Sequence, residues 1–237
     1  MKIAVISPKK VTQSATRLAQ LLSATHINHQ EIPDLSGFDL VFNYGSSKEI
    51  NHPNIINSPH AVSLCINKIS TLKRLEPVCS SISWTKDREK ALAWFCEDGV
   101  VVARESQTGS QGKGLTYAED RVTFDNAPAS FWTRFFPHEK EVRINVFKGT
   151  ILSIFDKQIK ELGDGHYEFD FVPLTIAGEH DQISLMISQI SKTLGIDYYG
   201  MDVLVNGNNF CKLLEVNSGP ILHPETEAKL IKLILES

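Results

Sequence analysis

The chain lacks several features that would point to common classes of protein. Its four cysteines show no Cys-x-x-Cys spacing, and Cys65 and Cys211 sit in apolar patterns. We interpret them as reduced core thiols of a cytoplasmic protein. The eight histidines form no ligand cluster of the His-x-x-x-His type, and no Ser/His/Asp or Cys/His catalytic pattern is visible.

The chain also lacks a strong charge imbalance and a long apolar run. A net charge of -4 gives no electrostatic reason to expect nucleic acid or an anionic membrane as a partner. No apolar run is long enough to span a bilayer. The first residues, 1–7, indicate a strand and not a signal peptide, because their apolar run is short and Pro-Lys-Lys follows. The composition, 42% hydrophobic and 22% charged, fits a globular protein of one large domain or two small ones.

What the chain does contain is an α/β (α+β) pattern of strands and helices. Residues 1–60 alternate strand-like and helix-like segments, and the remainder indicates mixed β-structure with flanking helices. One helix begins at Pro59 after the N-cap Ser58 and carries an apolar stripe as far as Leu72. Strands are expected at 2–7, 40–43, 99–103, 122–125, 129–136, 141–147, 150–156 and in a hairpin over 199–217, and further helices at 14–24, 87–95, 181–194 and 224–236.

The last hairpin contains the most informative residues. Asp202, Glu215 and Asn217 interrupt its apolar strands, and Glu215 and Asn217 are two apart, so they point to one face. Acids inside a buried strand need a cation or a partner charge. Two carboxylates and an amide oxygen suit Mg²⁺. The alternative is a surface hairpin with solvated acids.

The turn of this hairpin decides which face Asp202 occupies. An even-membered loop at Asn206-Gly207 or at Asn208-Asn209 places Asp202 on the face of Glu215 and Asn217, and Asn-Gly favours such a two-residue type I′ turn. A three-residue loop ending at Gly207 would place Asp202 on the opposite face.

A glycine-rich loop over residues 108–114 follows an apolar strand. Glycines permit positive φ and let backbone N–H groups approach phosphate oxygens, while Ser110 and Lys113 add a hydroxyl and a charge. The loop is not a Walker A motif, because Gly114 stands where Ser or Thr is needed and Gln107 where the first glycine should be. Taken alone, the loop is a weak signal, and a flexible hairpin loop is the simpler interpretation.

Together these motifs, from about residue 55 to 220, resemble those of ATP-grasp enzymes, in particular the small glutamate-ligase-like (RimK-like and phage-type) members. The resemblance implies an ATP-grasp fold with a short N-terminal α/β lobe over residues 1–60. The ATP-grasp domain would cover 61–237, with a lid at about 83–126 and a C-terminal metal- and ATP-binding subdomain at about 129–237.

The resemblance also implies roles for residues along the chain. Arg143 and Lys157 would be catalytic and would stabilise the transferring phosphate and the acyl phosphate. Glu141 would hold the ribose, and residues 132–137 would form the hinge that binds adenine. Asp202, Glu215 and Asn217 would hold Mg²⁺, with Mn²⁺ as an alternative. The ATP-binding residues implied are Lys68, Arg104 in place of the usual lysine, Ser110, Gln111, Gly112, Lys113, Gly114, Arg134, Phe135, Phe136 and Glu141.

The two catalytic candidates depend on a second turn. A three-residue turn at Phe147-Lys148-Gly149 would place Arg143 and Lys157 on one face, whereas a two-residue turn would separate them.

The function implied is that of an ATP-dependent carboxylate–amine ligase, which acts through an acyl phosphate and releases ADP and phosphate. Its partners would be small-molecule or peptide carboxylates and amines, with no nucleic acid and no membrane. An ATP-binding regulatory module and a kinase or phosphotransferase on the same scaffold are the alternatives. The sequence identifies neither the two substrates nor the oligomeric state.

Overall fold

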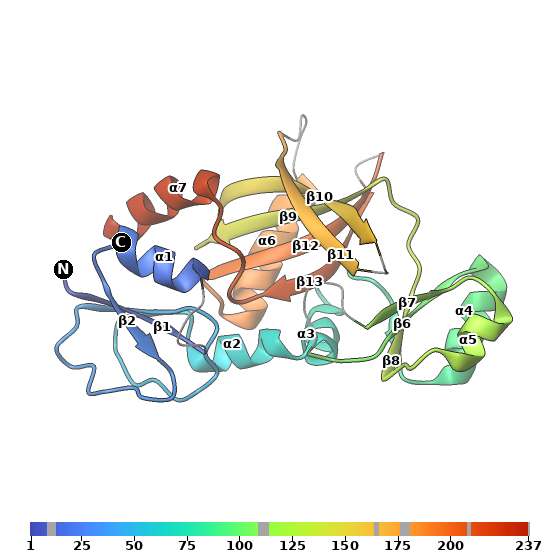
Figure 1. Cartoon of the computed structure of the whole chain (residues 1–237), viewed down its shortest axis with the longest axis horizontal. Coiled ribbons are helices and arrows are strands. Elements are labelled where there is room, and N and C mark those ends of the chain that lie inside the picture. The colour runs from blue at the N-terminus through green and yellow to red at the C-terminus, as the bar shows by residue number, and fades with distance from the viewer. Residues whose placement is uncertain (9–12, 109–113, 164–165, 176–180, 208–209, 237) are drawn as a thin grey trace.

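The computed structural model describes residues 1–8, 13–108, 114–163, 166–175, 181–207 and 210–236. Three sheets follow one another along the long axis of the molecule (Figure 1). The N-terminal sheet lies at one end, a large five-stranded sheet in the middle and a small four-stranded sheet at the other end.

The N-terminal sheet is parallel, in the order β2-β1-β3-β4. Strand β1 is buried along its whole length, as expected of a parallel strand covered on both faces. The predicted α/β lobe is therefore present, although the pattern of residues had not indicated β2. Its elements are β1 (Ile3–Ser7), α1 (Gln13–Leu21), β2 (Thr25–Asn28), β3 (Leu40–Asn43) and β4 (Ile55–Ile56).

The large sheet is antiparallel, in the order β11-β10-β9-β12-β13. Helix α6 ends before Gly195, which has a positive φ, and packs on one face with α2 (Pro59–Ile66). Helix α7 and the N-terminal lobe pack on part of the other face. The elements are β9 (Lys140–Phe147), β10 (Thr150–Gly163), β11 (His166–Pro173), α6 (Asp181–Leu194), β12 (Tyr198–Asn206), β13 (Phe210–Asn217) and α7 (Pro224–Leu235).

Strand β9 shows how the two faces differ. Val142, Ile144 and Val146 are buried in the core formed with α6. Glu141 and Arg143 alternate with them and so point to the opposite face. Polar side chains in the middle of this sheet are thus held on the face that α6 does not cover.

The small sheet has the order β5-β8-β6-β7 and carries two helices. Strand β8, the last of this sheet along the chain, ends at Arg134, so the sheet continues past residue 126, where the lid was expected to end. The strand expected at 122–125 is wrong: these residues are helical, because the Asp120 side chain accepts the Thr123 N–H at 2.7 Å as an N-cap. The elements are β5 (Trp84–Thr85), α4 (Arg88–Asp98), β6 (Val101–Arg104), β7 (Leu115–Ala118), α5 (Arg121–Asn126) and β8 (Phe131–Arg134).

The helix after Ser58 is divided in two. Ser58 caps α2 (Pro59–Ile66) as predicted, but the single apolar stripe to Leu72 belongs to two helices. Asn67 is extended, and its side chain accepts the Ser70 N–H at 3.0 Å, so it starts α3 (Lys68–Leu75). This break places Lys68 in the first turn of α3.

Both predicted turns of the large sheet are wrong, yet both predicted faces are correct. Phe147 pairs with Thr150, so Lys148-Gly149 is a two-residue turn, with φ of 46° and 79° as a type I′ turn requires. The register then shifts between Ile151 and Ser153, so β10 carries one extra residue. This bulge brings Arg143 and Lys157 back to one face.

In the β12–β13 hairpin the error is reversed: a two-residue turn was predicted, and the loop is longer. Asn206 pairs with Phe210, which contradicts a two-residue turn; residues 208 and 209 lie outside the described residues. The register shifts between Asp202 and Val203, where β13 carries an extra residue. Asp202 therefore pairs directly with Glu215.

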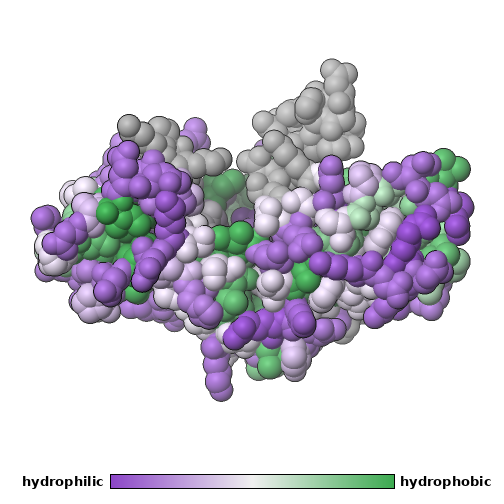
Figure 2. Space-filling model, turned by 90° about the horizontal axis from the view of Figure 1, so that it is seen from below, coloured by the Kyte–Doolittle hydropathy of each residue, from purple (hydrophilic) through white to green (hydrophobic). Residues whose placement is uncertain are grey.

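The surface in the view from below is mostly polar, and its apolar areas are separated by polar side chains (Figure 2). Within the part of the chain that the structure describes, no helix is long and apolar enough to cross a membrane.

Candidate functional site

A row of charged residues crosses the middle of the large sheet. Arg143 on β9 pairs with Asp202 on β12, and Asp202 pairs with Glu215 on β13. The Arg143 guanidinium donates to both carboxylate oxygens of Asp202, with Nη2 at 2.8 Å from Oδ2. Lys157 donates to the same Oδ2 at 3.2 Å and also to Glu141. Two cations and three carboxylates thus occupy one face of four adjacent strands, β10, β9, β12 and β13.

Burial and the neighbouring charges act in opposite directions on the pKa values of Asp202, Arg143, Lys157 and Glu141. Burial raises the pKa of Asp202, but Arg143 and Lys157 outweigh it and hold that pKa well below its usual value. Burial lowers the pKa of Arg143 and of Lys157, and the neighbouring carboxylates more than reverse this. Burial raises the pKa of Glu141 against the opposing effect of Lys157.

Glu215 has a different environment from Asp202. Lys68 in the first turn of α3 donates to its carboxylate, and both side chains are 17% exposed. The Asn217 amide donates to Glu215 Oε1 at 2.9 Å. The structure therefore brings Asp202, Glu215 and Asn217 to one place, together with Lys68.

The donor set at this place fits a divalent cation. It consists of two carboxylates and the side-chain amide oxygen of Asn217, which are the hard oxygen ligands that Mg²⁺ accepts. The amide is needed as the third protein ligand. Among the described residues, no three His, Cys, Asp or Glu side chains come together as a metal cluster. Phosphate oxygens would have to complete the shell, and Lys68 and Lys157 would have to leave the carboxylates for the phosphates.

The small sheet contributes Arg104 from β6. Arg104 is buried and donates to Thr133 Oγ1 at 3.2 Å. Burial lowers its pKa, and the negative charges of Glu215 and Glu141 act in the opposite direction. The two carboxylates thus lie within electrostatic range of a cation from the small sheet.

The other predicted nucleotide contacts lie in several places. Ser110, Gln111, Gly112 and Lys113 lie outside the described residues. Gly114 has a φ of 71°, and a Cβ there would meet the Cβ of Glu105 at 2.9 Å, so glycine is required. On β8, Arg134 binds Glu97 and Asp98 of α4 and is not part of the charged row. The Phe135 ring lies beside His138.

An apolar cluster adjoins the charged row, and sequence reasoning identified only one of its members, Phe136. Leu204 pairs with Glu141 and lies two residues from Asp202 on β12, so it shares the face of the charged residues. Side chains from the hinge and the small sheet pack over it. The cluster comprises Leu72, Ile82 and Leu204, with Trp84, Phe136 and Leu214 packed against them.

A cavity of about 420 Å³ continues from the charged row toward the N-terminal lobe. Lys68, Glu215 and Asn217 line it, and Pro8 and Gly45 bound it where β1 and β3 end. The ends of parallel strands are where α/β folds place ligand contacts.

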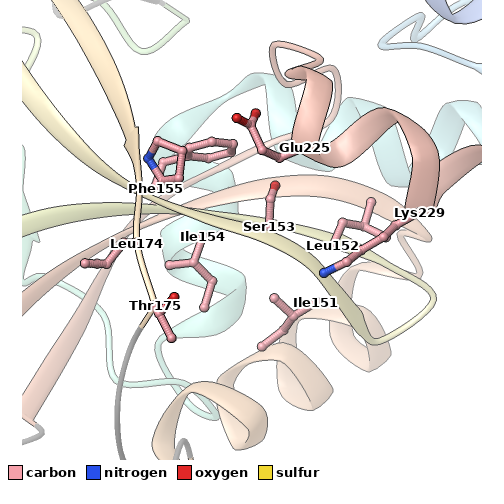
Figure 3. A pocket seen from close by; sticks show the side chains of 10 residues that line it. Ile151, Leu152, Ser153, Ile154, Phe155, Leu174, Thr175, Glu225 and Lys229 are labelled. Carbon is pink, nitrogen blue, oxygen red and sulfur yellow. The ribbon is translucent and has the colours of Figure 1, made fainter.

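A second cavity lies at the edge of β10, against Glu225 and Lys229 of α7 (Figure 3). None of the predicted site residues lines it. The charged row and the apolar cluster therefore point to a different part of the molecule.

Comparison with solved structures identifies the fold. The whole chain superposes on ATP-grasp ligases, so it has the ATP-grasp fold, and the fold predicted from the motifs is confirmed. No protein-family model matches the chain, and no curated protein sequence matches it.

Three of these structures illustrate the similarity. The ATP-grasp ligase PsnB, complexed with its minimal precursor, has a TM-score of 0.71 at 14% identity, covering 100% of this chain and 99% of that chain. D-alanine–D-alanine ligase from Bacillus anthracis has a TM-score of 0.71 at 16% identity, covering 100% and 96%. A RimK domain ATP-grasp protein from Sphaerobacter thermophilus has a TM-score of 0.65 at 14% identity, covering 99% and 100%.

Proposed function

We propose that the protein is an ATP-dependent carboxylate–amine ligase. The observation that carries the proposal is the row Arg143–Asp202–Glu215, flanked by Lys157 and Lys68, on the face of an ATP-grasp sheet that α6 does not cover. Several solved proteins of this fold are ligases, and PsnB has been solved with Mg and ADP.

The charged row and the apolar cluster divide the work of holding a nucleotide. The cluster around Leu204 and Phe136 offers an apolar surface for the base. Glu141 pairs with Leu204 and lies between base and phosphates, where a carboxylate can accept hydrogen bonds from the ribose hydroxyls. Arg143, Lys157, Lys68 and Arg104 supply the positive charge that the phosphates need.

The reaction has two steps. A carboxylate oxygen of the first substrate attacks the γ-phosphorus, and ADP leaves with the bridging oxygen. The amine nitrogen of the second substrate then attacks the acyl carbon, loses a proton, and displaces phosphate to form an amide. Arg143 and Lys157 stabilise the negative charge on the phosphoryl oxygens in both steps.

Asp202, Glu215 and Asn217 would hold Mg²⁺, or Mn²⁺ in its place. The ion would neutralise negative charge on the β- and γ-phosphates. Closure of the small sheet would exclude water from the acyl phosphate. The cavity that runs from Lys68 to Gly45 would admit the substrates, which would be small-molecule or peptide carboxylates and amines. A cytoplasmic location, with reduced cysteines, is part of the proposal.

A panel of amino acids and short peptides tests this function. We expect ADP release that requires both a carboxylate and an amine, with a product lighter by one water than the two substrates together. A phosphorylated product formed without amine would instead identify a phosphotransferase. ADP binding without turnover on any pair would leave a regulatory module.

A further inference from the structure

Trp84 carries a buried hydrogen-bond donor that has no partner. Its indole Nε1 is one of four buried side-chain nitrogen or oxygen atoms, among the described residues, that make no hydrogen bond. An indole N–H can only donate. Buried donors in folded proteins are almost always paired, so an unpaired one needs an explanation.

The apolar neighbours of Trp84 supply no side-chain acceptor, and the hydroxyl of its cross-strand partner, Thr133, accepts from Arg104 instead. The indole packs in the apolar cluster with Ile82, Leu204 and Phe136, which are hydrocarbon groups. Its own strand, β5, is only two residues long and pairs with β8 alone. The chain thus maintains an unpaired donor among the side chains of the apolar cluster.

The position of the cluster identifies the kind of ligand. Leu204 pairs with Glu141 on β9, and Glu141 is bound by Lys157 of the charged row. A molecule whose phosphates lie at the charged row would therefore extend its base over Leu204. A purine offers flat apolar faces and ring nitrogens that accept a hydrogen bond.

We propose that the Trp84 N–H donates a hydrogen bond to a ring nitrogen of the adenine base and so helps to select it. This inference rests on the proposed function, because it requires that the site bind an adenine nucleotide. It adds a specificity-determining residue from β5, before the predicted hinge at 132–137.

Adenine nucleotides that lack one ring nitrogen test the contact. Calorimetric titration would compare ADP with 1-deaza-, 3-deaza- and 7-deaza-ADP on the wild-type protein and on Trp84→Phe. We expect one analogue to bind the wild type about tenfold more weakly than ADP, the effect of one lost hydrogen bond at a buried donor. Trp84→Phe keeps a ring but removes the N–H, so it should bind ADP and that analogue equally.

Trp94→Phe is the matched control. Trp94 is a buried tryptophan of the same subdomain, packed in the core between α4 and the small sheet. This variant should keep the discrimination between ADP and the deaza analogue.

The inference is overturned if the wild type binds all three analogues as well as ADP. It is equally overturned if Trp84→Phe keeps the discrimination, or if it weakens ADP and every analogue by one common factor. A wild type that fails to bind ADP at all would contradict the proposed function itself, which separates the two failures.

Discussion

Asp202 and Glu215 are direct neighbours across β12 and β13, yet their surroundings differ greatly. The Asp202 side chain is fully buried and is bound by Arg143 and by Lys157. The Glu215 side chain is 17% exposed, is bound by Lys68 and Asn217, and lines a cavity. One carboxylate belongs to the interior of the fold, and the other faces the space that a ligand would enter.

The sequence predicted one shared role, metal binding, for both carboxylates, whereas their surroundings separate a role in stability from a role in ligand binding. A buried ion pair leaves an uncompensated charge in the interior when one partner is removed. A partly exposed ion pair contributes little to stability, because water and salt screen it. We therefore expect Asp202 to be needed for folding as well as for the proposed ligand binding, and Glu215 to be needed for the ligand alone.

The largest effect is expected from Asp202→Asn. Removing this charge leaves Arg143 buried without its counter-ion, so the free energy of unfolding should fall by about 3–5 kcal/mol. Urea denaturation followed by circular dichroism measures it. A loss below about 1 kcal/mol would mean that Asp202 and Glu215 do not differ as described.

Arg143→Lys keeps a positive charge beside Asp202 but removes the guanidinium that can contact two phosphoryl oxygens at once. We expect kcat to fall by about a hundred- to a thousand-fold. The affinity for ADP, measured by calorimetry, should change far less. If the variant loses ADP affinity and keeps kcat, Arg143 is a binding residue and not a catalytic one.

Glu215→Gln should have the stability of the wild type to within about 1 kcal/mol. Its defect should concern the metal: if Mg²⁺ strengthens nucleotide binding in the wild type, that enhancement should fall by about tenfold or more in the variant. Calorimetric titration of ADP with and without Mg²⁺ measures it. An unchanged enhancement would remove Glu215 from the metal site.

Glu141→Gln should raise KM for ATP severalfold and leave kcat nearly unchanged, because a contact to the ribose contributes equally to the ground state and the transition state. Steady-state kinetics with varied ATP provide the check. A loss confined to kcat would instead place Glu141 at the reacting phosphate.

A pH series sharpens the contrast between the two carboxylates. The folded state lowers the pKa of Asp202, so its stabilisation is present above the unfolded value of about 3.9 and is lost as pH falls through the folded value. The difference in unfolding free energy between wild type and Asp202→Asn should therefore shrink below about pH 4. A constant difference across that range would contradict the charge pairing.

The sequence allowed the charged row to be predicted for reasons that are physical and local. Acids and an arginine at alternate positions of otherwise apolar strands must share a face. The bulges could not be foreseen, because the extra residues, Leu152 and Leu214, are ordinary apolar residues that mark no irregularity. Each bulge compensates a turn of the wrong length, so the predicted faces were correct although the predicted turns were not.

The apolar cluster could not be predicted, because it depends on packing between distant segments. Trp84 and Leu204 are far apart in the chain, and neither belongs to a motif. The helix at Arg121–Asn126 was missed for a different reason: β-branched residues favour strands, and the capping by Asp120 outweighs that preference.

The central claim is that ATP activates a carboxylate, and isotope transfer tests it most directly. The carboxylate substrate that the panel identifies would be labelled with ¹⁸O in its carboxyl group, and the released phosphate would be examined by mass spectrometry. An acyl phosphate passes one carboxyl oxygen to phosphate, so the account predicts phosphate that carries one ¹⁸O atom, formed in step with the amide. Unlabelled phosphate formed with the product would contradict the proposed reaction.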